Sequence, residues 1–494
     1  MSNKIDLKKH QQIAVNFIKN PDNRGLILFH STGSGKTITA LTAMYQFQND
    51  IIIIGPKSSK KAFVDDIEKL GFNLNKFTLY SYGKIYNLLE TNSDIFRDKC
   101  IIIDEAHKLR NDTTNNLYLI GALQFAYKII LLTATPVINY LNDISNLVNI
   151  VKFKEILPTD RKYFNHLYFD EDTMTITDVA LLVKNINNTF SYYENFDDPN
   201  YPKSTYHTIN VEMNKDQIDE YIKYIKKIVY PEAKNMTLEQ LLNIDFEKLE
   251  KKKRNAFLVV TRQLSNTINN DHNAPKIKAM FDIIKNGPFP IVVYSNFLKN
   301  GVYTLAKLLD NNNLSCKIIT GNTNHDKMNM IVNDYNKRMF DILLLSSAGS
   351  ESLDLKNTRQ IHIMEPHWNM SKIIQVIGRA IRYKSHEKLD QKNRHVDVYN
   401  WISIFPKLPN DIKYDTADQY LLKLSKRKKE IFDKFKEIII STSIENQTNQ
   451  IEQIEQNEQI EQNGGLLNKN IYKNGYIKYK YKYIKCLHHL KSQL

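Results

Sequence analysis

The chain of 494 residues has few cysteines and no long apolar run. Its three cysteines, Cys100, Cys316 and Cys486, are far apart and odd in number, which argues against a disulfide framework or a zinc site. The longest purely aliphatic run, Val179–Val183, is much shorter than the roughly 18 residues that span a bilayer. The first residues also lack the apolar stretch of a signal peptide. We therefore expect a protein of a reducing compartment that is not secreted and does not contact membranes.

Basic residues outnumber acidic ones, 68 Lys and Arg against 54 Asp and Glu, which gives a net charge of +14. This excess favours polyanionic partners such as nucleic acid. Lys, Asn, Ile and Tyr are all abundant, however, as AT-rich coding would produce, so the charge alone does not decide the question. The 42% of hydrophobic residues excludes a wholly disordered chain, and the length is sufficient for two or three domains.

Two stretches of the chain alternate short apolar runs with longer mixed segments, which is typical of a buried parallel sheet covered by helices. The runs of the first stretch are Gly25–Phe29, Ile51–Ile54, Cys100–Ile103 and Ile129–Leu132. Those of the second stretch are Pro290–Tyr294, Cys316–Thr320, Asp341–Leu345 and Arg359–Met364. The sequence therefore predicts the α/β class, with one parallel-sheet lobe over residues 1–150 and another over 273–440.

The region between the lobes and the end of the chain differ from both. Residues 151–272 have no strand rhythm over most of their length, and Asp216–Ile228 and Leu238–Gln263 show helical spacing, which predicts a largely helical insertion. From about 441 the composition changes: residues 444–463 carry five Glu and no basic residue, and 466–494 carry seven Lys and no acid. We interpret 441–494 as a low-complexity linker and a Lys/Tyr-rich tail.

The strongest local motif runs from His30 to Thr37, between a predicted strand and a predicted helix. Its residues are His30, Ser31, Thr32, Gly33, Ser34, Gly35, Lys36 and Thr37. The glycines let backbone amides close around phosphate oxygens at a helix N-terminus. Lys36 would neutralise the β- and γ-phosphates, and the Thr37 hydroxyl would ligate Mg²⁺. The motif predicts a nucleoside triphosphate site; the alternative is a chance match in a helix cap.

A second motif, Asp104-Glu105-Ala106-His107, directly follows an apolar strand. Carboxylates there lie at the carboxyl edge of a parallel sheet, where open α/β folds bind ligands. Asp104 is expected to hold Mg²⁺, and Glu105 to orient and deprotonate the attacking water. An acidic pair after a strand is otherwise an ordinary solvated loop. Its position after a phosphate loop favours the functional interpretation.

The second α/β stretch supplies Arg379 and Arg382, three residues apart and therefore on one face of a helix. Guanidinium groups suit the charge that develops on a transferred phosphoryl group, so we expect both arginines to be catalytic. Two further segments add context. Residues 131–136 end a strand in Thr133-Ala134-Thr135-Pro136, and residues 347–355 form a small-residue loop that ends near Asp354.

Together these motifs resemble those of the superfamily 2 helicases and translocases, in order and spacing, over residues 5–440. The chain is most similar to the DEAH-type ATPases of large cytoplasmic DNA viruses, among them the poxvirus early transcription factor small subunit and nucleoside triphosphatase I. These are related to Swi/Snf-type translocases. The phrases that carry this likeness are Ser191–Glu194, Met364–Asn369 and Arg379–His386.

The resemblance implies two RecA-like lobes with ATP and Mg²⁺ in the cleft between them. It assigns adenine reading to Gln11 and a ribose contact to Asp354. It also implies contacts to a nucleic-acid backbone, and the residues in those motif positions are Pro56, Lys57, Ser58, Thr133, Ser295 and Ser347. The resemblance also marks two departures, His30 in place of a small residue and Ser352 in place of a glycine.

Three functions fit this pattern. The first is an ATP-dependent helicase or translocase on DNA or RNA, with DNA favoured, in viral early transcription and with a viral RNA polymerase as a partner. The second is a DNA-dependent ATPase subunit of an initiation or termination complex that separates no strands. The third is a virion structural protein with a vestigial ATPase. The resemblance implies a location in the virion and in the viral factory of the host cytoplasm. The tail would serve as a nucleic-acid accessory or as a packaging tag.

Overall fold

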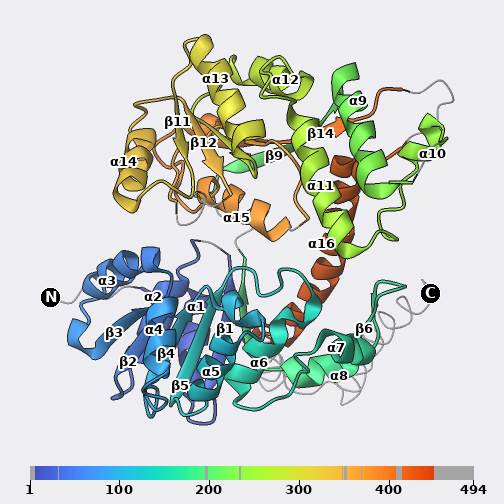
Figure 1. The fold of residues 1–494 in the computed structure, drawn as a ribbon. Helices are drawn as coiled ribbons and strands as arrows, with labels where there is room; N and C mark the ends of the chain where they lie inside the picture. Colours follow the sequence, from blue (N-terminus) through green and yellow to red (C-terminus); the bar gives the residue numbers. More distant parts are fainter. Residues whose placement is uncertain are drawn as a thin grey trace, which may run out of the picture. The chain divides into compact units, whose positions relative to one another are not determined.

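Two parallel sheets organise the computed structural model of the chain (Figure 1). The structure describes residues 6–31, 33–194, 199–232, 235–347, 349, 353–368, 370–407 and 414–449. Residues up to Ile444 form one compact unit that contains both sheets. Among the described helices, none combines the length and the apolar character that a membrane crossing requires.

The first sheet has six parallel strands in the order β3-β2-β4-β5-β1-β8. They are β1 (Gly25–His30), β2 (Ile51–Gly55), β3 (Phe77–Ser81), β4 (Cys100–Asp104), β5 (Lys128–Thr133) and β8 (Phe190–Tyr193). The four strands expected in this part of the chain are thus confirmed, and β3 and β8 are additional. Because β5 separates β1 from β4, the phosphate loop and the acidic motif leave the same edge of the sheet two strands apart.

Alternate residues of these strands enter two different cores, as the pleat of a sheet covered on both faces requires. One core joins Ile27, Ile101 and their equivalents to α4 (Tyr82–Leu89), α5 (Thr114–Leu123), α6 (Ser145–Lys152) and α8 (Val179–Ile186). The other core joins Leu28, Ile102 and their equivalents to α1 (Lys9–Lys19), α2 (Lys36–Tyr45) and α3 (Lys60–Lys69).

The second sheet is also six-stranded and parallel, in the order β11-β12-β10-β13-β14-β9. Its strands are β9 (Lys203–Glu212), β10 (Ile291–Ser295), β11 (Cys316–Ile319), β12 (Ile342–Ser346), β13 (Gln360–Ile363) and β14 (His395–Ile404). One face packs against α14 (His325–Asn336) and α15 (Met370–Ala380), and the other against α12 (Pro275–Ile284) and α13 (Thr304–Asn311). The four strands expected here are confirmed as well.

Residues 151–272, expected to form a largely helical insertion, contain several helices and also supply two strands that complete the sheets. β8 pairs with β1 in the first sheet, and β9 pairs with β14 along ten residues of the second. Both are edge strands, and β9 is mostly exposed, so neither shows the continuous apolar run of a central strand.

The helices of this region are α7 (Arg161–Tyr168), α9 (Lys215–Tyr224), the π-helix η5 (Ile225–Val229), α10 (Leu238–Leu242) and α11 (Lys251–Asn266). Two expected helical stretches are thus confirmed with interruptions. A two-stranded hairpin of β6 (Phe169–Asp170) and β7 (Thr175–Ile176) follows α7.

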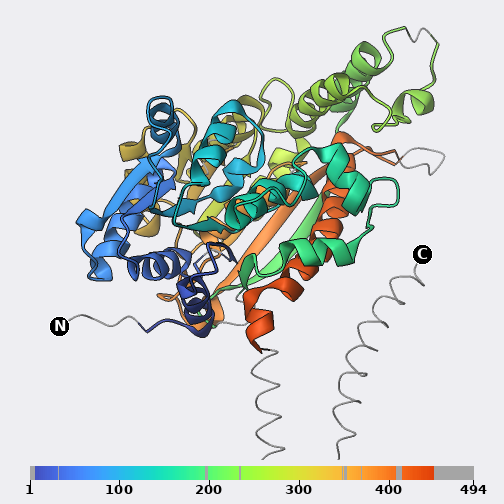
Figure 2. The same cartoon turned by 90° about the horizontal axis from the view of Figure 1, so that it is seen from below.

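The last described helix, α16 (Ala417–Thr442), packs against elements of both sheets (Figures 1 and 2). Its first turns, with Ala417 and Leu421, join a core formed with α9, α10 and α11. Further along, Phe435 and Ile439 enter a core of the first sheet. Ile444 is 3% exposed and packs in the other core of that sheet. The tail therefore does not begin at 441 as expected; most of the low-complexity linker and the whole Lys/Tyr-rich segment lie outside the described residues.

Candidate functional site

The predicted phosphate loop connects β1 to α2 at the carboxyl edge of the first sheet. Gly33 and Gly35 have φ angles of 78° and 85°, in the left-handed region that favours glycine. A β-carbon at Gly35 would lie 2.5 Å from Nε2 of Gln11, so a side chain there would displace Gln11 in addition to straining the backbone. The loop thus has the close backbone approach that phosphate binding needs. Thr32 lies outside the described residues.

Lys36, at the start of α2, folds its side chain back over this loop. Its Nζ donates hydrogen bonds to the backbone oxygens of His30, at 2.7 Å, and Ser31, at 3.0 Å. Removal from water lowers the pKa of Lys36 to about 8, an effect that the charges of Glu105 and Asp104 oppose. The ammonium group is therefore held against the loop and lies within the electrostatic influence of both acidic residues. Thr37 follows in the first turn of α2, partly buried.

His30 forms the floor of the loop. Its side chain is fully buried, and its Nε2 lies 2.7 Å from the Ser191 hydroxyl on β8. Its ring meets the edge of His10, which in turn stacks on Tyr193 at 3.4 Å between ring centroids. The side chain of His30 therefore packs beneath the loop, and its backbone oxygen accepts from Lys36; the ATP contact expected of His30 stays a prediction. Burial lowers the pKa of both histidines, so they are neutral at physiological pH.

Gln11 lies against the opposite side of the loop. Its side-chain Nε2 is 3.4 Å from the Ser34 backbone oxygen and 3.5 Å from that of Gly35. Its Oε1 accepts a hydrogen bond from the backbone N–H of Lys8 at 2.8 Å. Gln11 is thus held at the base of α1 and contacts the loop directly. The adenine contact that the resemblance assigns to it stays a prediction.

The acidic motif begins at the last residue of β4. Glu105 has a φ of 51°, a conformation that non-glycine residues rarely adopt and that turns the chain sharply after Asp104. The buried Tyr82 hydroxyl donates to the backbone oxygens of Asp104, at 2.8 Å, and Glu105, at 3.2 Å, and so braces this turn. Burial, together with the Glu105 charge, raises the pKa of Asp104 to about 6. Both carboxylates act electrostatically on Lys36, so the structure brings the two motifs together.

His107 links this turn to the neighbouring strand β5. Its Nδ1 lies 3.3 Å from Glu105 Oε2 and 3.3 Å from the Thr133 hydroxyl. Burial lowers the pKa of His107 to about 4, so the ring is neutral. Thr133 is 1% exposed, and its hydroxyl also accepts from the Thr135 N–H at 3.1 Å. The side chain of Thr133 is thus buried and already bonded, and the nucleic-acid contact expected of this residue stays a prediction.

The two arginines come from the second sheet, at the end of α15. The positive charges of Arg382 and Arg379 both lower the pKa of Lys36, so they lie close to the phosphate loop. Arg382 Nη1 is 3.4 Å from Oδ1 of Asp354, whose side chain is 58% exposed. The arrangement gathers three cations and two carboxylates from both sheets around one loop, as binding and cleavage of a triphosphate require.

Two tyrosines that the sequence did not single out also reach the loop. A β-carbon at Gly33 would lie 3.1 Å from Cβ of Tyr383 and 3.3 Å from the Tyr201 hydroxyl. The Nζ of Lys8 lies 4.8 Å from the centre of the Tyr383 ring. In the sequence, the position of Tyr383 directly after Arg382 could have indicated that it lies near the phosphate loop. No sequence feature indicated this for Tyr201, which lies on the segment between the two sheets.

The expected nucleic-acid contacts separate into two groups. Pro56, Lys57 and Ser58 follow β2, where Lys57 is exposed beside a cavity of about 160 Å³ that also has Lys60 and Lys84 in its wall. These positions are accessible, and their role stays a prediction. Ser347 is partly buried and is bonded through its hydroxyl to Lys372.

Ser295 is fully buried, and its hydroxyl donates to Glu365 at 3.0 Å. The side chain of Ser295 is thus buried like that of Thr133, and the nucleic-acid contact expected of this residue stays a prediction. Residues 348 and 350–352, the centre of the small-residue loop, lie outside the described residues.

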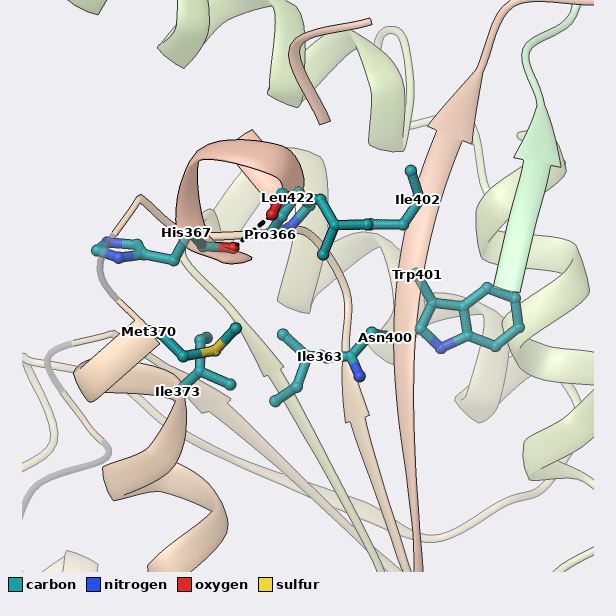
Figure 3. A pocket seen from close by; sticks show the side chains of 10 residues that line it. Ile363, Pro366, His367, Met370, Ile373, Asn400, Trp401, Ile402 and Leu422 are labelled. Carbon is teal, nitrogen blue, oxygen red and sulfur yellow. Dashed lines mark hydrogen bonds between the residues drawn. The ribbon is translucent and has the colours of Figure 1, made fainter. Parts of the chain in front are cut away.

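A second cavity, beside the start of α15, is mostly apolar (Figure 3). Ile363, Met370, Trp401 and Leu422 line it, and its volume is about 20 Å³. That is room for about one water molecule, so it cannot hold a nucleotide. The site around Lys36 is therefore the candidate for catalysis.

Comparisons with known proteins agree with this geometry. The model of the SNF2-related domain matches residues 49–274, and that of the helicase conserved C-terminal domain matches residues 275–384. A model described as the res subunit of type III restriction enzymes matches residues 4–59.

Three relatives come from large DNA viruses. A protein of Acanthamoeba polyphaga mimivirus named "Putative ATP-dependent RNA helicase" is 54% identical, over 90% of this chain and 98% of its own length. The termination factor NPH-I homolog of African swine fever virus is 22% identical, over 86% of this chain and 76% of its own. Nucleoside triphosphatase I of Heliothis armigera entomopoxvirus is 24% identical, over 90% of this chain and 80% of its own length. This chain therefore belongs to the SNF2-related helicase family, as a nucleic-acid-dependent ATP hydrolase of the kind found in large DNA viruses.

Proposed function

We propose that the chain is a Mg²⁺-dependent motor that uses ATP hydrolysis to move along DNA within a viral transcription apparatus. The observation that carries this proposal is the electrostatic coupling of Lys36 to Asp104 and Glu105 from the first sheet and to Arg379 and Arg382 from the second. Groups on both sheets would contact one triphosphate, so hydrolysis would change how the two sheets are held together. A strand bound by both would then be moved along its backbone.

Each residue has a distinct role in the proposed reaction. Backbone amides of the loop and the Lys36 ammonium would hold the β- and γ-phosphates. Glu105 would orient a water molecule and accept its proton. His107, neutral and bonded to Glu105, would keep that carboxylate in position. Arg379 and Arg382 would stabilise the negative charge that develops on the γ-phosphoryl group in the transition state.

The residues around the loop also fit a magnesium ion. The Thr37 hydroxyl and the Asp104 carboxylate are hard oxygen donors at the ends of neighbouring motifs, and Mg²⁺ in such sites takes few protein ligands besides water and phosphate oxygens. Burial and the Glu105 charge raise the pKa of the Asp104 carboxyl to about 6 even though Lys36 opposes this shift, so a cation bound there would stabilise its charged form. When bound there, Mg²⁺ would neutralise phosphate charge.

The names of the relatives support a role in transcription. A termination factor and a nucleoside triphosphatase I are among them, and the mimivirus relative's name points to RNA as the rival substrate. We propose a viral RNA polymerase as the partner and the virion and viral factory as the location. An ATPase subunit that separates no strands is a variant of this proposal. A vestigial ATPase is disfavoured, because the positions of Lys36, Asp104, Glu105, Arg379 and Arg382 are all filled.

ATP turnover in the presence of single-stranded DNA, duplex DNA and RNA tests the proposal. We expect duplex DNA to stimulate hydrolysis most, and displacement of a third strand from a triplex without separation of the duplex. Strand separation would identify a helicase in the strict sense. If RNA stimulated ATP turnover and DNA did not, the motor would act on RNA instead of DNA. If no nucleic acid stimulated turnover, the motor function would be refuted.

A further inference from the structure

Two basic side chains lie over the ring of Tyr140, on the loop that follows the Thr133–Pro136 segment. The guanidinium carbon of Arg161, at the start of α7, lies 3.8 Å from the centre of the tyrosine ring. The Nζ of Lys428, on α16, lies 5.8 Å from it. Tyr140, Arg161 and Lys428 form what we call the Tyr140 cluster, and the charge of Arg254 on α11 also acts on Lys428. The two cations of the cluster thus come from helices that are far apart in the sequence.

The backbone around the cluster is firmly held. Asp143 Oδ2 accepts hydrogen bonds from the N–H groups of Ile138, Asn139 and Tyr140, at 2.8, 2.6 and 3.3 Å. Asp160 caps α7 through the Tyr163 N–H at 2.8 Å and so fixes the turn that carries Arg161. α11 and α16 pack against each other, as Figure 1 shows. The cluster is therefore preorganised, and 39% of the Tyr140 surface remains exposed.

The positive charge of the cluster is only weakly compensated. Asp143 is already bonded to three amides. Glu171 pairs with Arg161, but both side chains are about half exposed, and such surface pairs contribute little. Burial lowers the pKa of Lys428, and repulsion by Arg161 and Arg254 lowers it further, while the Asp143 charge offsets part of this shift. A polyanion bound at the cluster would relieve that repulsion.

We infer that the Tyr140 cluster is a contact site for the phosphate backbone of the nucleic acid on which this ATPase acts. This inference rests on the proposed function. Cations beside a partly exposed aromatic ring suit a polynucleotide, because phosphates meet the charges while a base or sugar meets the ring. The site would read the backbone and no sequence. An acidic protein segment could also pair with the two positive charges, but its carboxylates would gain nothing from the exposed Tyr140 ring.

Charge reversal tests the inference in the full chain. Arg161→Glu and Lys428→Glu are compared with Lys307→Glu, an equal change of charge at an exposed position on α13. Binding of a fluorescent duplex is measured by anisotropy at several salt concentrations, and thermal melting confirms that each variant is folded. We expect each cluster variant to weaken binding roughly tenfold and to reduce the slope of log Kd against log salt by about 1, because a phosphate contact is lost. Tyr140→Ala should weaken binding more than Tyr140→Phe does.

The outcomes separate the inference from the function on which it rests. If wild type is stimulated by DNA but the cluster variants bind as Lys307→Glu does, the inference is overturned and the motor function stands. If Tyr140→Ala binds like wild type while the charge reversals weaken binding to any polyanion, including heparin, equally, the site is not a polynucleotide contact. If nucleic acid stimulates nothing in the wild type, the proposed function itself fails. Where a reversal variant does not fold, Arg161→Gln and Lys428→Gln replace it.

Discussion

His107 and Thr133 are joined inside the first sheet: Nδ1 of the imidazole lies 3.3 Å from the threonine hydroxyl. This contact connects the turn that carries Glu105 with the loop that leaves β5. The contacts run from Glu105 through His107 and Thr133 to the backbone of Thr135, and from there the chain itself continues to Tyr140. The path offers a physical route by which nucleic acid could affect ATP turnover.

Thr133→Val should break this path while it preserves the shape of the side chain. We expect nucleic-acid stimulation of turnover to fall severalfold more than the unstimulated rate, because His107 loses its partner on β5. Thr133→Ser keeps the hydroxyl and serves as the control. Steady-state ATPase assays with and without duplex DNA measure the ratio. An unchanged ratio in the valine variant would show that the contact is structural only.

Glu105→Gln should bind ATP but lose turnover by about 10²- to 10⁴-fold, the range typical of general-base catalysis. The amide keeps the size of the side chain but cannot accept the proton of the attacking water. Nucleotide binding by calorimetry and turnover by phosphate release separate the two effects. Near wild-type turnover would mean that another group takes the proton.

Arg382→Ala should reduce kcat by about 10³-fold or more with a much smaller change in ATP affinity, because a guanidinium at this position acts on transition-state charge. The control is a variant of Asp354, the residue that pairs with Arg382 in the structure. Asp354→Asn leaves the arginine in place, so this variant should retain far more turnover than Arg382→Ala. Equal losses of affinity and kcat in Arg382→Ala would make the arginine a ground-state ligand of ATP.

Activation by Mg²⁺ should weaken as the pH falls through about 6. Burial and Glu105 raise the pKa of Asp104 to about 6, so this carboxylate is ionised at pH 7.5 and mostly protonated at pH 5. The protonated form is a poor metal ligand, and the apparent Mg²⁺ affinity should drop about tenfold between those values. Mg²⁺ titrations of ATPase activity, corrected for Mg²⁺ binding to free ATP, measure this. Asp354→Asn should follow the wild-type profile, and a midpoint near 4 would contradict the assignment.

Removal of residues 450–494 should leave unstimulated ATP turnover and thermal stability unchanged. A truncation that also removes Ile444 should differ, because this side chain is 3% exposed in a core of the first sheet. Ile444→Ala in the full chain should lower the free energy of unfolding by about 2–5 kcal/mol. Loss of stability on removal of 450–494 would show that the tail belongs to the fold. Weaker DNA binding would identify a nucleic-acid accessory, and absence from purified particles a packaging tag.

The central strands and the phosphate loop could be predicted from the sequence, because their signals are local. A buried parallel strand such as Cys100–Asp104 needs a continuous apolar run, and a phosphate loop needs Gly33, Gly35 and Lys36 at fixed spacing. Edge strands do not need a continuous apolar run, because one side of them is open to solvent. β9 is polar and mostly exposed, and only its ten-residue register with β14 makes it a strand.

The roles of single side chains were decided by tertiary structure alone. Thr133 and Ser295 stand in motif positions that suggest nucleic-acid contacts, yet both are buried at the ends of central strands, where their hydroxyls bond to His107 and Glu365. His30 could be read as part of the loop, but its partner Ser191 lies 161 residues away on a neighbouring strand. Local spacing determines which backbone groups form a loop. Which way a side chain faces, and what bonds it, depends on residues that only the folded sheets bring together.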